Sequence, residues 1–252
     1  MIEDQKIIGI IPARYGSKRF EGKVLADLLG KPVLQHVWER AKQSKFLDDL
    51  LIACDDERIE RCAKEFGAKV VMTSKDHLSG SDRLTEVVAS LDVYGVINIQ
   101  GDEPLIHQTM IDGLARALTL DPICPMATLI TRIQDAKELR DPNVVKVVID
   151  KDKFALYFSR SVIPYNRDKI PFKEVGYYKH LGIYGYTRDF LFIFKSLSKS
   201  RLERSEQLEQ LRVLEAGYKI KTVETLRETV GVDTPEDLEK AADLLRKEAA
   251  VG

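Results

Sequence analysis

Short apolar runs alternate with amphipathic segments over roughly the first hundred residues. The apolar runs are "KIIGII" (6–11), "LLIAC" (50–54), "AKVVM" (68–72) and "GVINI" (95–99). They are rich in β-branched residues and show no alternation with polar positions, which is typical of strands that are buried on both faces. The pattern therefore predicts four buried strands in this part of the chain.

The segments between these runs have helical periodicity. One apolar face recurs in residues 32–45, and further helices are predicted at about 56–66 and around the apolar stripe within 84–91. Strands and helices in strict alternation form parallel sheets with crossover helices. We therefore predict an α/β fold, a Rossmann-like and mainly parallel sheet with helices on both faces.

The pattern changes after Pro142. Residues 143–150 and 154–160 are predicted as adjacent strands around the turn "DKDK", and the aromatic-rich stretch 180–187 as a third. We expect an antiparallel arm at about 143–190, whose edge either pairs with a second copy or is covered within the chain. Since no repeat or linker interrupts the sequence, residues 1–252 are predicted to form a single domain that includes the arm.

Three more elements are predicted near the C-terminus. Glu203–Glu215 is expected to be one helix, with Glu206 and Gln210 on one face at i, i+4. A strand is predicted at 218–224, and a last helix begins near Thr234.

Composition narrows the classes of partner and compartment. The chain has 252 residues, 39 basic against 40 acidic, and a net charge of -1, which argues against a nucleic-acid or membrane partner. Its three cysteines form no CxxC pair, so neither a disulfide framework nor a zinc site is expected. With no long apolar run and an acidic start, the protein is predicted to be cytoplasmic.

The loop after the first predicted strand is strongly basic. The stretch "IIPARYGSKRFEGKV" (10–24) contains Arg14, Lys18, Arg19 and Lys23. Open α/β sheets bind ligands at the carboxyl ends of their strands, and guanidinium groups with loop amides bind phosphate well. The loop thus predicts a polyphosphate site, with a solvated basic loop as the alternative.

Two common phosphate motifs do not match this loop. Gly16 and Gly22 are separated by five residues and Val24 follows Lys23, whereas the P-loop has four residues between its glycines and Ser or Thr after Lys. The dinucleotide pattern GxGxxG is absent as well.

Two carboxylates are expected near the loop. Asp102 in "QGDEP" follows a predicted strand, and Glu103 with Pro104 is interpreted as the turn that ends it. Asp233 precedes the helix start "TPED". Converging carboxylates beside a triphosphate suit Mg²⁺, which prefers oxygen ligands and shares them with phosphates. The alternatives are that Asp102 is only a turn residue and that Asp233 is only a surface acid beside a helix cap. The acidic cluster 55–57 makes a rival metal site, but it is interpreted instead as a strand-end turn and helix start that can border the pocket.

Seven segments in order carry a family resemblance. The stretch "IIPARYGSKRFEGKVLADLLGKPVL" is followed by "SGSDRL", "NIQGDEPLI", "VKVVIDKDKFALYFSRSVIPY", "HLGIYGY", "LEQLRVLEAG" and "GVDTPEDL". Together they resemble the nucleotide-sugar cytidylyltransferases that act on 3-deoxy-manno-octulosonate (Kdo), over nearly the full chain. Two positions depart from the family pattern: Glu21 stands where Pro is usual, and Ser205 where an apolar residue is usual.

The resemblance implies a reaction and a set of residues. CMP would pass from CTP to the anomeric hydroxyl of Kdo, giving CMP-Kdo and pyrophosphate for lipopolysaccharide, with Mg²⁺ on Asp102 and Asp233 and with a homodimer as the assembly. Lys23 and Arg14 would act with these acids in catalysis. The nucleotide would be bound by Pro12, Ala13, Arg14, Gly16, Ser17, Arg19, Lys23, Thr73, Ser74, Ser79, Gly80, Ser81 and Gln100, and the sugar by Arg83, Gln100, His180, Tyr184, Glu206 and Gln210.

Several readings stay open at this point. Ser81 also suits a helix N-cap, and Arg160 suits either the pocket or the arm. The acceptor can be another acid sugar, such as 8-amino-Kdo or a sialic acid, and the nucleotide can be UTP or GTP. A non-catalytic nucleotide-binding regulator is the alternative from a different class of protein.

Overall fold

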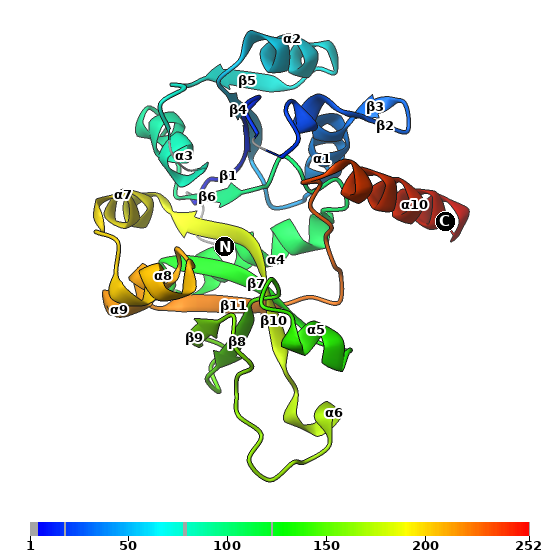
Figure 1. Cartoon of the computed structure of the whole chain (residues 1–252). Coiled ribbons are helices and arrows are strands. Elements are labelled where there is room, and N and C mark those ends of the chain that lie inside the picture. The colour runs from blue at the N-terminus through cyan, green and yellow to red at the C-terminus, as the bar shows by residue number, and fades with distance from the viewer. Residues whose placement is uncertain (1–4, 18, 78–79, 122, 252) are drawn as a thin grey trace. The chain divides into compact units, whose positions relative to one another are not determined.

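The computed structural model describes residues 5–17, 19–77, 80–121 and 123–251. Its Cα positions form two compact units, one of residues 1–115 with 228–252 and the other of residues 116–227. Figure 1 shows the elements of both. None of the helices described is long and apolar enough to cross a membrane.

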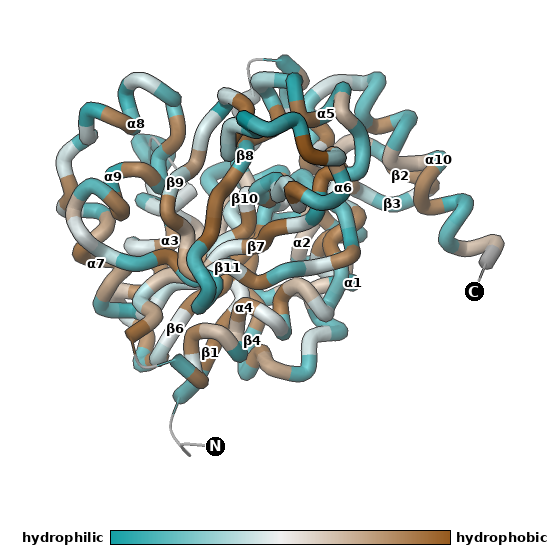
Figure 2. The backbone as a smooth tube through the Cα atoms, turned by 90° about the horizontal axis from the view of Figure 1, so that it is seen from below, coloured by the Kyte–Doolittle hydropathy of each residue, from teal (hydrophilic) through white to brown (hydrophobic). Residues whose placement is uncertain are grey.

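The first unit contains a parallel sheet built by the four apolar runs. Its strand order is β6 (Gly95–Asn98), β1 (Ile7–Ala13), β4 (Asp49–Cys54) and β5 (Lys69–Met72). All three pairings are parallel. The four predicted strands form, and β6, β1 and most of β4 are buried, but β5 at the edge of the sheet is not, since Lys69 and Met72 are exposed and Val70 and Val71 only half-buried. In Figure 2 β1 and β4 are brown along most of their length.

Helices cover both faces of this sheet, as predicted. The chain moves in one direction from β1 to β4 to β5 through α1 (Val33–Ala41) and α2 (Glu57–Glu65), then returns past β1 to β6 through α3 (Gly80–Ala89). Because parallel crossovers are right-handed, this reversal places α3 on the face opposite α1 and α2. The α1 and α3 helices lie on opposite sides of the strands in Figure 1.

A smaller cluster joins the start and the end of the first unit. A short 3₁₀ helix (Lys23–Leu25) leads into the hairpin of β2 (Asp27–Leu28) and β3 (Lys31–Pro32). Leu28 packs with Val232 and with Ala241 of α10 (Pro235–Val251). The last helix thus begins next to the predicted Thr234, and this packing holds the segment that carries Asp233.

The second unit is built on a mixed sheet. Its strands are β11 (Ile220–Glu224), β7 (Met126–Arg132), β10 (Tyr178–Thr187), β8 (Lys146–Ile149) and β9 (Ala155–Ser159). β11 runs parallel to β7, whereas β7–β10, β10–β8 and β8–β9 are antiparallel. The predicted antiparallel arm is therefore confirmed, although β7, its partner within the unit, was not predicted.

Six helices of the described residues complete the second unit or lead into it. α4 (Gln108–Leu120) spans the boundary between the units, and α5 (Ala136–Arg140), α6 (Phe172–Val175) and α7 (Arg188–Ser196) follow. The predicted single helix over 203–215 is wrong. The chain forms α8 (Arg201–Glu206) and α9 (Leu211–Glu215), because Gln207 between them takes a left-handed conformation at φ 54°. Glu206 and Gln210 therefore do not share a helical face.

Candidate functional site

The basic loop leaves the carboxyl end of β1 and folds back on itself. The Gly22 amide donates to the Tyr15 carbonyl at 2.9 Å. Gly22 has φ +67°, and an added Cβ would lie 3.0 Å from the Tyr15 ring, so this turn requires glycine. The Arg58 guanidinium stacks over the same ring at 3.3 Å. These contacts fix the base of the loop, from which Arg14 and Arg19 extend to solvent.

A cavity of about 200 Å³ opens beside the loop, within the first unit. Gly101 lies in its wall, where a Cβ would come within 2.9 Å of the Pro12 carbonyl oxygen. Only glycine permits this approach between the β1 and β6 ends. The lining consists of Pro12, Arg14, Lys23, Val24, His77, Gly80, Arg83, Gln100, Gly101 and Asp102. Seven of these were predicted as site residues, all except Val24, His77 and Gly101.

Asp102 and Asp233 converge on one cation. The Lys23 ammonium contacts Asp102 and lies 2.9 Å from Asp233 Oδ1. Arg19 reaches the other Asp233 oxygen at 2.7 Å. The Val232 amide donates to the Asp102 carbonyl at 2.8 Å, which ties the two acid-bearing segments together although they are far apart in sequence.

Lys23 stays charged in this setting. Burial by itself would lower the pKa of its ammonium, but the carboxylates of Asp102 and Asp233 raise that pKa above its ordinary value. The side chain is 12% exposed, against 66% for Arg19. Lys23 is thus the more buried of the two cations and contacts both acids, whereas Arg19 is the more exposed one and contacts Asp233.

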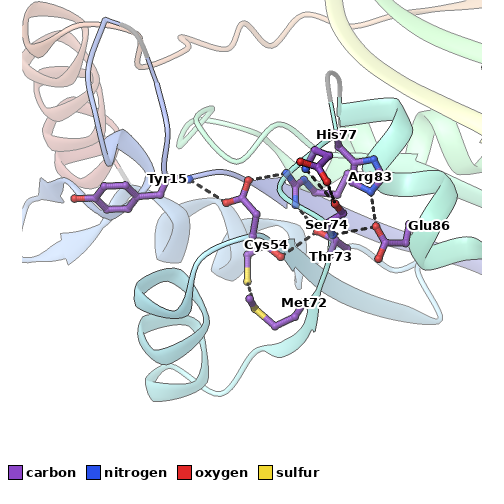
Figure 3. A network of polar contacts seen from close by, with 10 residues as sticks. Tyr15, Cys54, Met72, Thr73, Ser74, His77, Arg83 and Glu86 are labelled. Carbon is purple, nitrogen blue, oxygen red and sulfur yellow. Dashed lines mark hydrogen bonds and ion pairs between the residues drawn. The ribbon is translucent and has the colours of Figure 1, made fainter.

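Arg83 connects the loop to the next strand end, as Figure 3 shows. Its guanidinium lies 2.7 Å from Asp55 Oδ2 and also contacts the Thr73 hydroxyl. Asp55 Oδ1 in turn accepts from the Tyr15 amide at 3.3 Å. The Arg83 and Asp55 side chains are only 4% and 13% exposed. Asp55 therefore borders the site as a partner of Arg83, not as part of a rival metal cluster.

His77 and the predicted residue Ser74 share one carboxylate. The Ser74 amide donates to Glu86 Oε2 at 3.1 Å, and His77 contacts the same oxygen. The pKa of Glu86 is lowered below its usual value, mainly by its hydrogen bond with His77. His77 lies in the same loop as the predicted nucleotide residues Thr73 and Ser74, but no spacing pattern in the sequence distinguished it there.

The remaining predicted nucleotide residues lie around this cavity. Ala13 ends β1 and is buried, whereas a Cβ added to Gly16 would meet nothing within 4 Å. Ser17 lies in the loop itself. Ser81 is the second residue of α3 as described, inside the first turn, where its carbonyl accepts from Thr85 at 2.8 Å. Ser79 falls outside the described residues, as does Lys18.

Glu103 is a buried acid that sequence reasoning treated only as part of a turn. Burial raises the pKa of its carboxyl to about 7, and the neighbouring Asp102 charge adds to the rise, while a hydrogen bond from Thr229 opposes it. Its Oε2 has no hydrogen-bond partner among the described residues. Through Thr229, Glu103 is a second link between the Asp102 turn and the segment leading to Asp233.

The two converging acids fit a divalent cation. Both already contact a single positive group, the Lys23 ammonium, which shows that their oxygens point at one position. No group of three or more His, Cys, Asp or Glu with metal-site geometry occurs in the described part of the chain. Two carboxylates with phosphate and water oxygens form the ligand set that Mg²⁺ commonly takes, whereas Zn²⁺ needs more protein ligands.

In the second unit, His180 and Tyr184 lie together on β10. Their ring centroids are 5.3 Å apart, and Phe158 packs edge-on against His180 at 5.1 Å. Desolvation lowers the pKa of His180 to about 3 and raises that of Tyr184 well above its ordinary value. Both side chains are therefore neutral at physiological pH.

Glu206 and Arg160 form a structural junction in the same unit. Glu206 accepts from the Ser159 hydroxyl at 2.6 Å and from the Arg160 amide at 2.9 Å. The Arg160 side chain donates to the backbone carbonyls of Glu206 and Pro142. Gln210 is 4% exposed, and its Nε2 has no partner among the residues described. Of these side chains, Gln210 keeps the most unused hydrogen-bonding capacity.

An α/β sheet with a basic loop, a cavity and two carboxylates at its strand ends defines a nucleotide-binding protein with a phosphate site. Comparison with known proteins gives its family. The profile described as cytidylyltransferase matches residues 8–225. The chain belongs to the cytidylyltransferase family, as the resemblance in its sequence implied.

Named relatives and solved structures agree with this assignment. The 3-deoxy-manno-octulosonate cytidylyltransferase of Solibacter usitatus is 52% identical over 96% of this chain and 95% of the relative. The enzyme of the same name from Geotalea uraniireducens is 50% identical, over 96% of this chain and 100% of that relative. A CMP:2-keto-3-deoxy-manno-octonic acid synthetase solved with CTP has a TM-score of 0.92 and 45% identity, covering 97% of this chain and all of that one.

Proposed function

We propose that this chain transfers CMP from CTP to the anomeric hydroxyl of Kdo, releasing pyrophosphate. The observation that carries the proposal is the convergence of Asp102, Asp233 and Lys23 at a cavity bordered by the basic loop. This combination suits a triphosphate and its metal ion, and relatives named for this reaction match nearly the whole chain.

The reaction is a displacement at the α-phosphorus of CTP. The anomeric oxygen forms a new bond to that phosphorus, and the bond to the bridging oxygen of the β-phosphate breaks, its electron pair leaving with pyrophosphate. The hydroxyl proton is released as the new bond forms. Such chemistry depends on positioning and on charge stabilisation, and it requires no covalent enzyme intermediate.

The basic loop would bind the leaving group. Arg14 and Arg19 are exposed guanidiniums on a loop whose base is fixed, so they can close on a pyrophosphate with paired hydrogen bonds. Lys23 adds a third, more buried positive charge. Asp102 and Asp233 would hold Mg²⁺, which would neutralise phosphate charge and make the sugar hydroxyl more acidic when bound.

The candidate sugar-site residues of the second unit are uncharged apart from Glu206. His180, Tyr184 and Gln210 supply neutral donors and acceptors suited to hydroxyl groups, whereas both Glu206 oxygens already accept hydrogen bonds within the unit. We propose that Arg160 acts through this junction, by holding Glu206, and does not itself bind the sugar.

We also propose that two copies pair through the arm and act in the cytoplasm. Large apolar side chains of β9 and the following loop are exposed, including Leu156 at 60% and Tyr165 at 86%. A second copy would cover such a surface. All three cysteines are free thiols, which suits a reducing compartment. Leu156→Glu should convert a dimer to a monomer in light scattering, and a wild-type monomer would contradict the pairing.

One assay tests the reaction directly. Pyrophosphate release is measured with Mg²⁺ while CTP, UTP, GTP and ATP are crossed against Kdo, 8-amino-Kdo and sialic acid. Release only with CTP and Kdo is expected. Release with CTP and another acid sugar would reassign the acceptor, and binding of nucleotide without release from any pair would favour a regulator.

A further inference from the structure

A buried threonine lies against His180 in the second unit. Thr128 on β7 is 0% exposed, and its Oγ1 is 2.9 Å from His180 Nε2. The same oxygen is 2.9 Å from the carbonyl oxygen of Ile183 and 3.2 Å from that of Leu181. The hydroxyl thus has three neighbours but only one proton to donate.

The strand register indicates where that proton goes. The pairing of β10 with β7 shifts its register between Leu181 and Tyr184, the stretch that contains the Ile183 carbonyl. The Thr128 hydroxyl is a donor that points at a carbonyl in this irregular stretch. If it donated to His180 instead, it would be withdrawn from a buried carbonyl, which is costly.

The histidine must then be the donor in its own contact. When Thr128 gives its proton to the Ile183 carbonyl, its lone pair is left to accept an N–H from His180 Nε2. Both contacts are satisfied only if Nε2 carries the hydrogen. A neutral imidazole with hydrogen on Nε2 has a lone pair on Nδ1.

We infer that Thr128 fixes His180 as the Nε2–H tautomer, so that His180 recognises a sugar hydroxyl as an acceptor through Nδ1. The part concerning sugar rests on the proposed function. Nδ1 has no hydrogen-bond partner within the described residues, whereas Nε2 is occupied. The titratable side chain that packs against the ring is the neutral Tyr184, and among the described residues no carboxylate raises the pKa of His180, which burial alone lowers.

This assignment changes what the histidine can recognise. A protonated ring would bind the carboxylate of an acid sugar, but a neutral ring with an acceptor at Nδ1 selects an O–H donor. The carboxylate of the sugar must therefore be bound by other groups. Thr128 is a positioning residue, since it acts on the sugar only through His180.

The tautomer can be read directly by NMR. The chain has four histidines, so long-range ¹H–¹⁵N spectra are simple, and a His180→Asn variant assigns the ring by its missing signals. We expect the Nε2–H form in the wild type and in Thr128→Ser, which keeps the hydroxyl. Thr128→Val should lose that single form. A wild-type ring that carries hydrogen on Nδ1 or on both nitrogens overturns the inference, whether or not the enzyme is active.

Kinetics test the link to the sugar. Thr128→Val should raise the KM for the sugar about three- to tenfold, the worth of one neutral hydrogen bond, with the KM for CTP unchanged and with Thr128→Ser close to wild type. Thr222→Val is the matched control, because Thr222 is in register with Thr128 but its hydroxyl donates to the Lys153 carbonyl at 2.8 Å.

The outcomes separate this inference from the proposed function. Thr222→Val should leave both the tautomer and the sugar KM unchanged. Equal effects of the two valine variants on the sugar KM would overturn the inference, as would a normal KM in Thr128→Val. If the wild type releases no pyrophosphate with any pair, the proposed function fails, while the NMR spectrum still decides the tautomer.

Discussion

Replacement of Asp55 by Asn would test how the loop, α3 and the end of β4 are held together. Asp55 follows β4 directly, pairs with Arg83 at 2.7 Å and accepts the Tyr15 amide. The substitution keeps the shape of the side chain but removes its charge. Arg83, 4% exposed, would then be a buried cation with only neutral partners.

The cost can be worked from this burial. Removal of one partner from a buried ion pair costs about 3–5 kcal/mol. Because Asn retains one oxygen acceptor, we expect the lower end, about 3 kcal/mol of unfolding free energy. At a urea slope of about 3 kcal/mol per M, the unfolding midpoint would fall by about 1 M. The KM for CTP should rise as well, since the Tyr15 amide anchors the phosphate loop.

The control lies at the other end of the same strand. Asp49 begins β4 and pairs with Lys69 at 2.8 Å, but these side chains are 38% and 68% exposed. Asp49→Asn should cost about 0–1 kcal/mol, as is typical of surface pairs. Urea unfolding followed by circular dichroism measures both variants. Equal losses in the two, or a loss under 1 kcal/mol for Asp55→Asn, would refute the reasoning from burial.

Three further predictions concern the site. Asp102→Asn should reduce pyrophosphate release at least about a hundredfold while the urea midpoint changes little; near-normal turnover would remove Asp102 from the metal site. Lys23→Ala should raise the KM for CTP about tenfold or more, and an unchanged CTP dependence would exclude it from phosphate binding. His180 sets a pH dependence: the unfolded ring takes up a proton below about pH 6.5, the folded ring only near 3. Stability should therefore be complete above pH 6.5 and fall as the pH drops toward 4, less steeply in His180→Asn; parallel curves would contradict the low pKa.

The first unit could be predicted from sequence because its signals are local. Four apolar runs with helical segments between them specify parallel strands and crossovers, and the handedness rule then places the helices. The strand ends bring Arg14, Lys23 and Asp102 to one cavity, as expected for an open sheet. These predictions required only periodicity and topology.

The missed features depend on contacts between distant residues. No spacing in the sequence pairs Arg83 with Asp55, and Arg83 was predicted only as a sugar residue. The break at Gln207 was missed because glutamine is a good helix former, and its left-handed conformation comes from the tertiary structure. Glu103 was interpreted as a turn residue because burial cannot be read from a single acidic position.

The charges of the first unit support our proposal that a metal ion takes part in the reaction. Arg83 is neutralised by Asp55, and Lys23 and Arg19 by Asp102 and Asp233. Among Arg14, Arg19, Lys23 and Arg83, only Arg14 forms no ion pair with the described residues. A triphosphate with up to four negative charges therefore meets a site of small net charge. The two carboxylates, which would otherwise repel it, become favourable only when a divalent cation joins them, so CTP should bind weakly without Mg²⁺ and tightly with it.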